Sequence, residues 1–373
     1  MKLRFLAVLS VLVGGSLWLW SFTQTDPNLY YSSNNLWVNF QQMMWQIPRA
    51  TTAWWYVVMI FLSLVLYLST VQKRSKTIMI SACIGVLFLI LSNNALSHDL
   101  YNYMFNAKAV AVYHQDPHVK SALEIAPQDE WVRFMHNVHT PAPYGRFWTY
   151  FSLIPYLAGF GKFLTTYVSF KLFMLLGFAI LVWMQRQLHP KNLVLFILNP
   201  LVLIETFMNG HNDVWMMALA LASFVLILKT KKTLSWQTLV SFILLILSTQ
   251  VKFATALLLP LWIGLAVGKF EWIKKYWPEI ATILLFLPLF TDRSQQFNPW
   301  YLIWPLTFLP FITVKYVKIM LITFTLTSLL RYVPFLLLGE YTDTIQFQMR
   351  LITWSAIPIA TGIWLVARKK IWR

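Results

Sequence analysis

The sequence predicts an all-α, polytopic integral membrane protein of about 12 transmembrane helices. Of its 373 residues, 58% are hydrophobic and only 12% are charged, whereas a soluble domain usually carries about a quarter charged residues. Aromatic residues make up 17% of the chain, with 19 Trp, and such side chains gather where helices cross the membrane–water interface. The composition therefore excludes an ordinary soluble globular protein.

Apolar runs recur along the whole chain, and about 20 residues at roughly 1.5 Å per residue cross the hydrocarbon core. The first run follows Lys2 and Arg4 and extends to Trp20. No small-x-small cleavage site follows it, so we interpret it as an anchor rather than a signal peptide. The others cover about residues 53–71, 78–96, 165–185, 192–208, 214–228, 234–250, 253–268, 277–291, 299–314, 317–338 and 350–367. Together they predict twelve spans in a single transmembrane domain over residues 1–373.

The net charge of +17 belongs to one face of this predicted topology. If the spans alternate, both termini and the even-numbered connections hold 19 of the 30 Lys and Arg residues and only two acids, Glu271 and Glu279. The positive-inside rule makes this the cytoplasmic face. We therefore expect cytoplasmic termini, the lipid bilayer as a partner and no nucleic acid.

The same topology makes the longest loop, about residues 97–150, extracytoplasmic, together with six of the seven histidines. We expect this loop to be the catalytic region and residues 146–161 to form a short interfacial or re-entrant helix. The spacings of His114 with His118 and of His136 with His139 suit a metal on a helix face. No cysteine or clear third ligand accompanies them, so we expect solvated histidines and no cofactor, with a divalent metal left open.

Directly after the third apolar run comes Ser97-His98-Asp99-Leu100-Tyr101-Asn102-Tyr103. A carboxylate at the membrane boundary suits a general base that accepts a proton from a hydroxyl, close to a donor whose lipid tail lies in the bilayer. Ser97 or Asp99 as the N-cap of the next helix explains the same residues. Both interpretations stay open on these residues alone.

Polar residues Asn209-Gly210-His211-Asn212-Asp213 separate the fifth and sixth runs at the outer face. They suit either a polar floor that binds sugar hydroxyls or an ordinary tight helical hairpin. Glu205 lies about one turn inside the membrane, where an ionisable group usually has a partner or a role. The sequence does not identify that partner.

Lys252 lies at the outer end of the seventh run, on the face that the charge rule leaves poor in lysine. Its ammonium suits a phosphate leaving group, and snorkelling to the interface is the alternative. Pro143-Tyr144-Gly145-Arg146 predicts a rigid turn. Asn298-Pro299-Trp300-Tyr301 is typical of an interfacial aromatic belt, whose rings also suit stacking on a sugar.

Taken in order, these segments resemble the bacterial polyprenol-phosphate-mannose-dependent α-1,6-mannopyranosyltransferases of the GT-C superfamily, over about residues 90–305. The resemblance implies an inverting transferase in the bacterial plasma membrane. Its donor would be a polyprenyl-phosphate sugar, most often mannose, and its acceptor a glycolipid or glycan on the extracytoplasmic face. His98 stands where relatives often have basic or small residues, which leaves the identity of the sugar open.

The resemblance also implies roles for individual residues. Asp99 would be the catalytic base, and Lys252 with Arg146 would contact the donor phosphate. The expected substrate-binding residues are His98, Tyr101, Tyr103, Tyr144, Asn209, His211, Asn212, Asp213, Trp300 and Tyr301.

Two other classes of protein compete with a transferase. A transporter or flippase of polyisoprenoid-linked glycans would use Asp99 and Glu205 as coupling residues. No inverted repeat or paired broken helices are apparent in the sequence, and the polar residues gather at one face rather than at the midplane. A noncatalytic membrane scaffold would leave this polar cluster unexplained.

Overall fold

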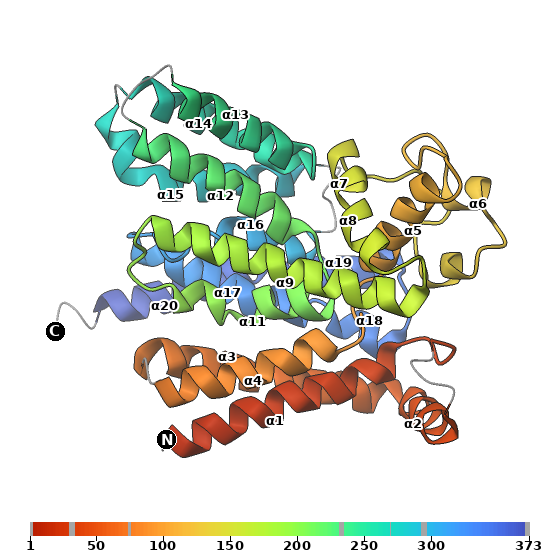
Figure 1. The fold of residues 1–373 in the computed structure, drawn as a ribbon. Coiled ribbons are helices and arrows are strands. Elements are labelled where there is room, and N and C mark those ends of the chain that lie inside the picture. The colour runs from red at the N-terminus through yellow and green to blue at the C-terminus, as the bar shows by residue number, and fades with distance from the viewer. Residues whose placement is uncertain are drawn as a thin grey trace.

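The computed structural model describes residues 3–29, 34–73, 76–230, 235–268, 270–291 and 297–369, and every regular element in these ranges is a helix. The long helices lie side by side, and the loop region of residues 97–150, called the outer loop region below, lies at one end of the molecule (Figure 1). The first turn of α1 and the last turns of α20 lie at the other end. Several basic residues of the charge argument lie outside the described residues: Lys2, Arg74, Lys231, Lys232, Lys269, Lys370 and Arg373.

The N-terminal helices form one layer of the molecule (Figure 1). They are α1 (Leu3–Ser21), η1 (Phe22–Gln24), α2 (Asn35–Trp45), α3 (Arg49–Lys73) and α4 (Lys76–Leu91). Helices α1 and α4 approach closely at Gly14 and Gly85, because a Cβ on Gly14 would lie 2.6 Å from the Gly85 Cα. Small residues at such a crossing allow two membrane helices to pack backbone against backbone.

The loop region at one end of the molecule contains short helices (Figure 1). They are α5 (Asp99–Ala111), α6 (Ala122–Ile125), η2 (Glu130–Phe134), α7 (Arg146–Phe151) and α8 (Leu153–Ala158). Ser121 and Glu124 form a capping box at the start of α6, and the Lys108 ammonium lies 2.5 Å from the Asp129 carboxylate. These contacts fix a region that has few long helices of its own.

The remaining helices form the rest of the bundle. They are α9 (Phe163–Gln187), α10 (Val194–Ile197), α11 (Pro200–Leu203), η3 (Ile204–Met208), α12 (Asp213–Lys229), α13 (Trp236–Thr249), η4 (Phe253–Leu258), α14 (Leu259–Val267), α15 (Glu271–Phe286), η5 (Leu287–Phe290), η7 (Pro299–Leu302), α16 (Ile303–Leu306), α17 (Lys315–Leu330), α18 (Val333–Leu338), α19 (Asp343–Trp354) and α20 (Ala356–Lys369).

The expected count of twelve spans is not confirmed. Within the described residues, five helical segments are long and apolar enough to cross a membrane: Arg4–Gln24, Arg49–Gln72, Phe163–Gln187, Lys315–Leu338 and Asp343–Arg368. A sixth results if Pro200–Met208 and Asp213–Lys229, which meet at 117°, count as one span. Other predicted runs fold into shorter pieces, and proline contributes because it removes a helical hydrogen bond. Run 277–291, for example, contains Pro278 inside α15 and Pro288 inside η5.

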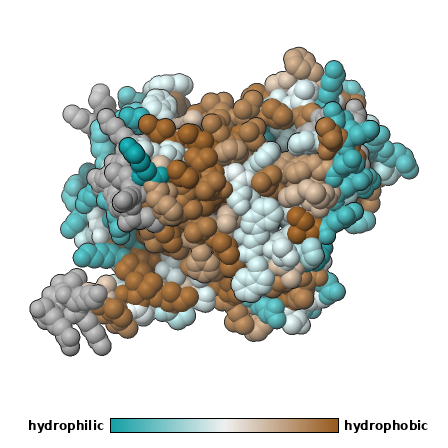
Figure 2. Space-filling view, turned by 90° about the horizontal axis from the view of Figure 1, so that it is seen from below, coloured by the Kyte–Doolittle hydropathy of each residue, from teal (hydrophilic) through white to brown (hydrophobic). Residues whose placement is uncertain are grey.

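The surface has the pattern that a bilayer requires. Seen from below, a broad hydrophobic zone crosses the middle of the molecule, and hydrophilic residues gather at both ends (Figure 2). Large apolar side chains are exposed on membrane helices, among them Phe61 on α3 and Leu172 and Trp183 on α9. An exposed apolar surface of this extent is stable in lipid and not in water, so the chain is a membrane protein.

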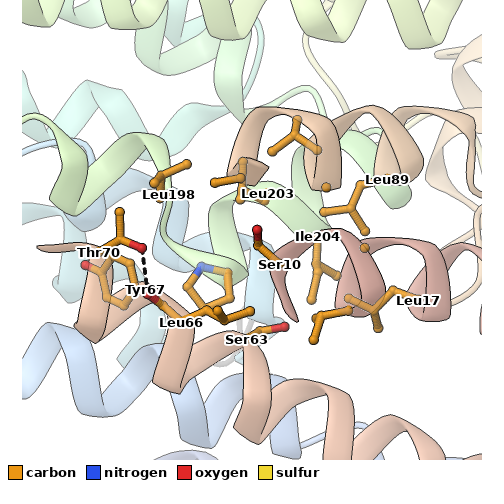
Figure 3. A pocket seen from close by; sticks show the side chains of 16 residues that line it. Ser10, Leu17, Ser63, Leu66, Tyr67, Thr70, Leu89, Leu198, Leu203 and Ile204 are labelled. Atoms are coloured by element: carbon orange, nitrogen blue, oxygen red, sulfur yellow. Dashed lines mark hydrogen bonds between the residues drawn. The ribbon is translucent and has the colours of Figure 1, made fainter. Parts of the chain in front are cut away.

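One cavity lies within the helix layers, between α1, α3, α4 and the segment that contains α11 (Figure 3). Its volume is about 80 Å³, and its lining includes Leu17, Tyr67 and Leu203. The Tyr67 hydroxyl donates to the Leu195 carbonyl at 2.8 Å. None of the described residues around this cavity is charged. It therefore lacks the groups that acid–base chemistry needs.

Candidate active site

A break in one long helical segment creates the polar centre of the molecule. Asn199 caps α11, where its Oδ1 accepts from the Leu201 amide at 3.0 Å, and Pro200 occupies the first turn. The chain continues as the π-helix η3 and then turns at Gly210, whose φ of 69° favours glycine. Helix α12 starts again at Asp213 after the bend. The break thus buries residues 209–213 against other helices.

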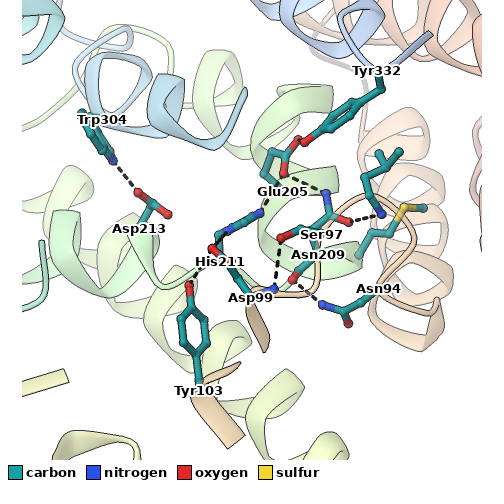
Figure 4. A network of polar contacts seen from close by, with 12 residues as sticks. Asn94, Ser97, Asp99, Tyr103, Glu205, Asn209, His211, Asp213, Trp304 and Tyr332 are labelled. Carbon is teal, nitrogen blue, oxygen red and sulfur yellow. Dashed lines mark hydrogen bonds and ion pairs between the residues drawn. The ribbon is translucent and has the colours of Figure 1, made fainter. Parts of the chain in front are cut away.

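Glu205 in η3 is fully buried, and the structure supplies the partners that its position requires. Its Oε1 accepts from the Tyr332 hydroxyl at 2.9 Å, and its Oε2 accepts from the Asn209 amide at 2.8 Å. The Asn209 side chain also accepts from the Leu96 amide at 3.2 Å, and its carbonyl accepts from Asn94 at 2.5 Å. Glu205 therefore contacts Tyr332 and Asn209 directly, and the segment of Asn94 and Leu96 fixes Asn209 in turn (Figure 4).

His211 lies between two carboxylates (Figure 4). Its Nδ1 is 3.3 Å from Asp99 Oδ2, and its Nε2 is 3.3 Å from Glu205 Oε2. The imidazole is fully buried and stacks on Trp300, with 4.1 Å between ring centroids and an interplanar angle of 19°. His211 therefore connects the first residue of α5 to the centre of the broken helix.

Lys252, just before η4, contacts the N-terminus of α12. Its Nζ lies 2.7 Å from Asp213 Oδ2, and the Trp304 indole donates to Asp213 Oδ1 at 2.5 Å. The ammonium also lies 5.8 Å from the centre of the Tyr144 ring. The Lys252 side chain is 13% exposed and Asp213 is fully buried. The Lys252 ammonium is therefore partly exposed, whereas the Asp213 carboxylate that it contacts is buried.

Asp99 and Lys252 line the same cavity, which has a volume of about 570 Å³. Polar and aromatic groups from distant segments share it: Asp99, Tyr144, Lys252, Trp300, Tyr301 and Trp304. A second part of the lining is apolar and includes Phe253, Leu257 and Leu287. The cavity thus offers a carboxylate, a cation, aromatic faces and an apolar wall to one ligand.

The electrostatics favour ionised Asp99. Burial alone raises the pKa of the Asp99 carboxyl, but His211, Lys252 and the Tyr144 hydroxyl outweigh burial and hold this pKa below its usual value of 3.8. The side chain remains 17% exposed. Asp99 is therefore a carboxylate at neutral pH and is accessible from the cavity, as a proton acceptor must be.

His98 faces a different cavity, of about 350 Å³, whose lining also includes His136, Arg49 and Tyr332. The rings of His98 and His136 stack with centroids 3.8 Å apart, and His98 Nδ1 lies 2.8 Å from the Phe134 carbonyl oxygen. Burial lowers the pKa of both histidines, that of His136 to about 4. Both rings are therefore neutral at pH 7.

Other residues predicted for the site lie beside it rather than in its lining. Arg146 pairs with Asp116 at 2.6 Å and is 55% exposed. The Tyr101 ring stacks on Tyr167, at 5.9 Å between centroids. Tyr103 lies closer to the centre, with its hydroxyl 3.5 Å from Asp99 Oδ2. The remaining predicted residues, Asn209 and Asn212, are fully buried at the helix break.

Three residues of the polar centre were not predicted from the sequence. Trp304 follows Trp300 by one helical turn, a spacing that places both on one face of the helix. Tyr332 is distant from Glu205 in sequence, so no local pattern connects them. Lys171, buried within the long helix α9, donates to the Phe207 and Met208 carbonyls at 2.5 and 2.7 Å. An intramembrane lysine was the available signal for this last residue.

The described residues contain no group of three or more His, Cys, Asp or Glu side chains placed to hold a metal ion. The histidines with suggestive spacing have other neighbours. His118 Nε2 lies 2.9 Å from the Thr149 hydroxyl, and His136 stacks on His98.

Comparison with known proteins identifies the family. The family model described as "Alpha-(1->6)-mannopyranosyltransferase, N-terminal domain" matches residues 4–268, which is well over half of the chain. No curated protein and no solved structure matches this chain. The matched range includes Asp99, His211 and Lys252, whereas Trp300 and Trp304 follow it. The chain belongs to the alpha-(1→6)-mannopyranosyltransferase family, and it is accordingly a membrane-bound glycosyltransferase that uses a sugar donor and an acceptor.

Proposed function

We propose that this protein transfers mannose from a polyprenyl-phosphate carrier to a hydroxyl of a glycolipid or glycan, with inversion at the anomeric carbon and Asp99 as the general base. The observation that carries the proposal is that Asp99 and Lys252 line one cavity of about 570 Å³. A base for the acceptor and a cation for the leaving group are the two charged groups that such a transfer needs.

The donor side of the cavity is suited to a lipid-linked sugar phosphate. Lys252 carries the positive charge that a phosphate requires, and Trp300 and Tyr301 present aromatic faces for a sugar ring. Phe253, Leu257 and Leu287 supply the adjoining apolar wall, which suits the first isoprene units. The proposed donor is therefore a lipid-linked sugar and not a nucleotide sugar.

The reaction follows from these positions. The acceptor hydroxyl gives its proton to Asp99 as its oxygen attacks the anomeric carbon, and the bond from that carbon to the phosphate oxygen breaks. The electron pair leaves with the lipid phosphate, whose growing negative charge Lys252 stabilises. Displacement from the opposite side converts a β-linked donor into an α-mannoside. Asp213, which lies 2.7 Å from the Lys252 ammonium, competes with the donor phosphate for this lysine.

The charge distribution supports an extracytoplasmic site in the bacterial plasma membrane. If the predicted apolar runs cross the membrane in alternation, 19 of the 30 Lys and Arg residues lie on the face of the termini, and the positive-inside rule assigns that face to the cytoplasm. The loop region 97–150, which carries Asp99, and Lys252 belong to the opposite face. Accessibility of single cysteines in the 97–150 loop to an impermeant thiol reagent on intact cells tests this orientation, since cytoplasmic placement would leave them unlabelled.

A donor panel tests the proposed reaction. The protein in lipid is offered radiolabelled polyprenyl-phosphate mannose, glucose, galactose and arabinose in turn, with a glycolipid mixture as acceptor. We expect label to move from mannose alone and the product to be an α-linked mannoside by NMR. Retention of the β configuration would contradict direct displacement. Transbilayer movement of the carrier without sugar transfer would support a flippase instead.

A further inference from the structure

Glu205 is the one buried carboxylate of the polar centre that the proposed reaction leaves without a task. It has no exposed surface, and it does not line the cavity that holds Asp99 and Lys252. A buried ionised carboxylate is costly unless donors surround it. Tyr332 and Asn209 donate to its two oxygens, and His211 Nε2 lies 3.3 Å from Oε2.

A single side chain, His211, lies between Glu205 and the cavity residue Asp99. His211 contacts Glu205 with Nε2 and Asp99 with Nδ1, each at 3.3 Å (Figure 4). The negative charge of a carboxylate beside each ring nitrogen favours an imidazole that carries a proton on both nitrogens. The stacked Trp300 ring and the hydrogen bond from the His211 amide to the Glu205 carbonyl, 3.0 Å long, keep the imidazole from turning away.

The backbone around Glu205 is also braced. Glu205 lies in a π-helix, a geometry that occurs frequently at functional sites. The buried Lys171 amine donates to the last two carbonyls of this π-helix, those of Phe207 and Met208. These hydrogen bonds satisfy carbonyls that the helix end leaves free. The position of the Glu205 carboxylate is thus fixed from both its side chain and its backbone.

From this geometry we propose that Glu205 is a positioning residue for the general base, which acts through His211 to orient the Asp99 carboxylate and to keep a positive charge beside it. This inference rests on the proposed role of Asp99. Glu205 neither contacts substrate nor accepts the proton. It holds His211 in its charged, doubly donating form, and His211 in turn keeps Asp99 ionised.

The other charged and titratable groups around this chain of contacts are few. Asp99 also faces Lys252, Tyr144 and Tyr103, and the neighbouring His98 and His136 interact with it more weakly. Glu205 faces Tyr332 and Tyr56 besides His211. Lys252 remains in every variant below, so any change in the protonation of Asp99 reports on His211 and Glu205.

The pH dependence of transfer separates positioning from a merely structural role. We compare kcat/KM between pH 4.5 and 8 for the wild type, Glu205→Gln, His211→Gln and the double variant, because this parameter reports the ionisation of the free enzyme. We expect a nearly flat wild-type profile on the acidic side. Each single variant should move the acidic limb up by about one pH unit, because His211→Gln removes the positive charge beside Asp99 and Glu205→Gln makes His211 easier to deprotonate. The double variant should move it no further than His211→Gln alone.

Glu130→Gln is the matched control, since Glu130 is exposed in the same outer region, and its profile should equal that of the wild type. Glu205→Asp keeps the charge but withdraws it from His211, so it should produce a smaller shift in the same direction. If Glu205→Gln does not fold, the pH profile of Glu205→Asp tests the inference on its own. A rate loss that is equal at every pH, with an unmoved acidic limb, would overturn the inference. That outcome differs from failure of the proposed function, in which the wild type transfers no mannose or Asp99→Asn remains active.

Discussion

The Lys252 ammonium lies 2.7 Å from the Asp213 carboxylate, so the accessible cation of the cavity already has an anionic partner before any donor binds. Asp213 is fixed in turn by the Trp304 indole at 2.5 Å. A donor phosphate must therefore share Lys252 with Asp213. The two residues are expected to affect donor use in opposite directions, which distinguishes a phosphate contact from a snorkelling lysine.

Lys252→Met should raise the donor KM by about tenfold or more, because it removes a charge-assisted contact worth roughly 1.5–3 kcal/mol. Steady-state transfer at varied donor concentration measures the effect. Arg146→Met is the matched control: Arg146 is exposed, pairs with Asp116 and does not line the cavity. Equal effects of the two substitutions would mean that the phosphate contact extends to the outer loop.

Asp213→Asn should lower the donor KM severalfold, because it removes a negative charge that competes with the phosphate for Lys252. The side chain keeps nearly the same shape and can still accept from Trp304. The same titration of donor concentration measures the change. An increase in KM as large as that of Lys252→Met would show instead that Asp213 is needed to orient the lysine.

Gly145→Ala should impair both folding and transfer. The Gly145 amide donates to the Val251 carbonyl at 3.2 Å, which ties the Tyr144 turn to the segment that carries Lys252. A methyl group at Gly145 would collide with the backbone carbonyl of Gln250. We expect a lower melting temperature and at least a tenfold loss of kcat/KM. Gly362→Ala, where the added methyl group meets no atom within 4 Å, should change neither quantity.

Asp129→Asn should destabilise the outer loop region in a pH-dependent way. Burial alone raises the pKa of the Asp129 carboxyl, but hydrogen bonds from Lys108, Tyr113 and the Trp131 amide outweigh burial and lower it below 3.8. The folded-state pKa is thus below that of the unfolded chain. Ionised Asp129 consequently stabilises the fold at pH values above about 3.8, and this stability is lost as the pH falls through the folded-state pKa.

Thermal unfolding in detergent at pH 7 should therefore show a decrease of several degrees for Asp129→Asn, at about 2–4 °C per kcal/mol. The difference from the wild type should persist down to about pH 4 and shrink only as the pH is lowered below about 3.8. Glu130→Gln, on the exposed neighbour, provides the control. A difference that stays constant below pH 3.8 would contradict the assigned ionisation.

Much of the polar centre could be predicted from local sequence. Asp99, His211, Asp213 and Lys252 stand out individually, because charged or polar residues at the ends of apolar runs are poorly explained by helix packing. The structure pairs Asp99 with His211 and Lys252 with Asp213, and Asp99 and Lys252 line one cavity. Their distances could not be predicted, since these depend on how α5, the helix break and the start of η4 pack together.

The partners of Glu205 could not be predicted from the sequence. A buried carboxylate predicts a donor nearby but not which one, and Tyr332 comes from the turn between α17 and α18, distant in sequence. The count of twelve spans was not confirmed for a related reason. Mean hydropathy does not separate a full span from the short consecutive helices α10, α11 and η3 within residues 192–208, because a proline or a π-helical turn changes direction without changing apolarity.

Transfer of radiolabelled mannose from polyprenyl phosphate to a glycolipid acceptor by purified wild type and Asp99→Asn tests the central claim most directly. The substitution removes the proton acceptor at nearly constant shape, so donor binding should persist while transfer falls by at least about 10²–10⁴-fold. Full transfer by Asp99→Asn, in protein that binds donor as the wild type does, would contradict the account.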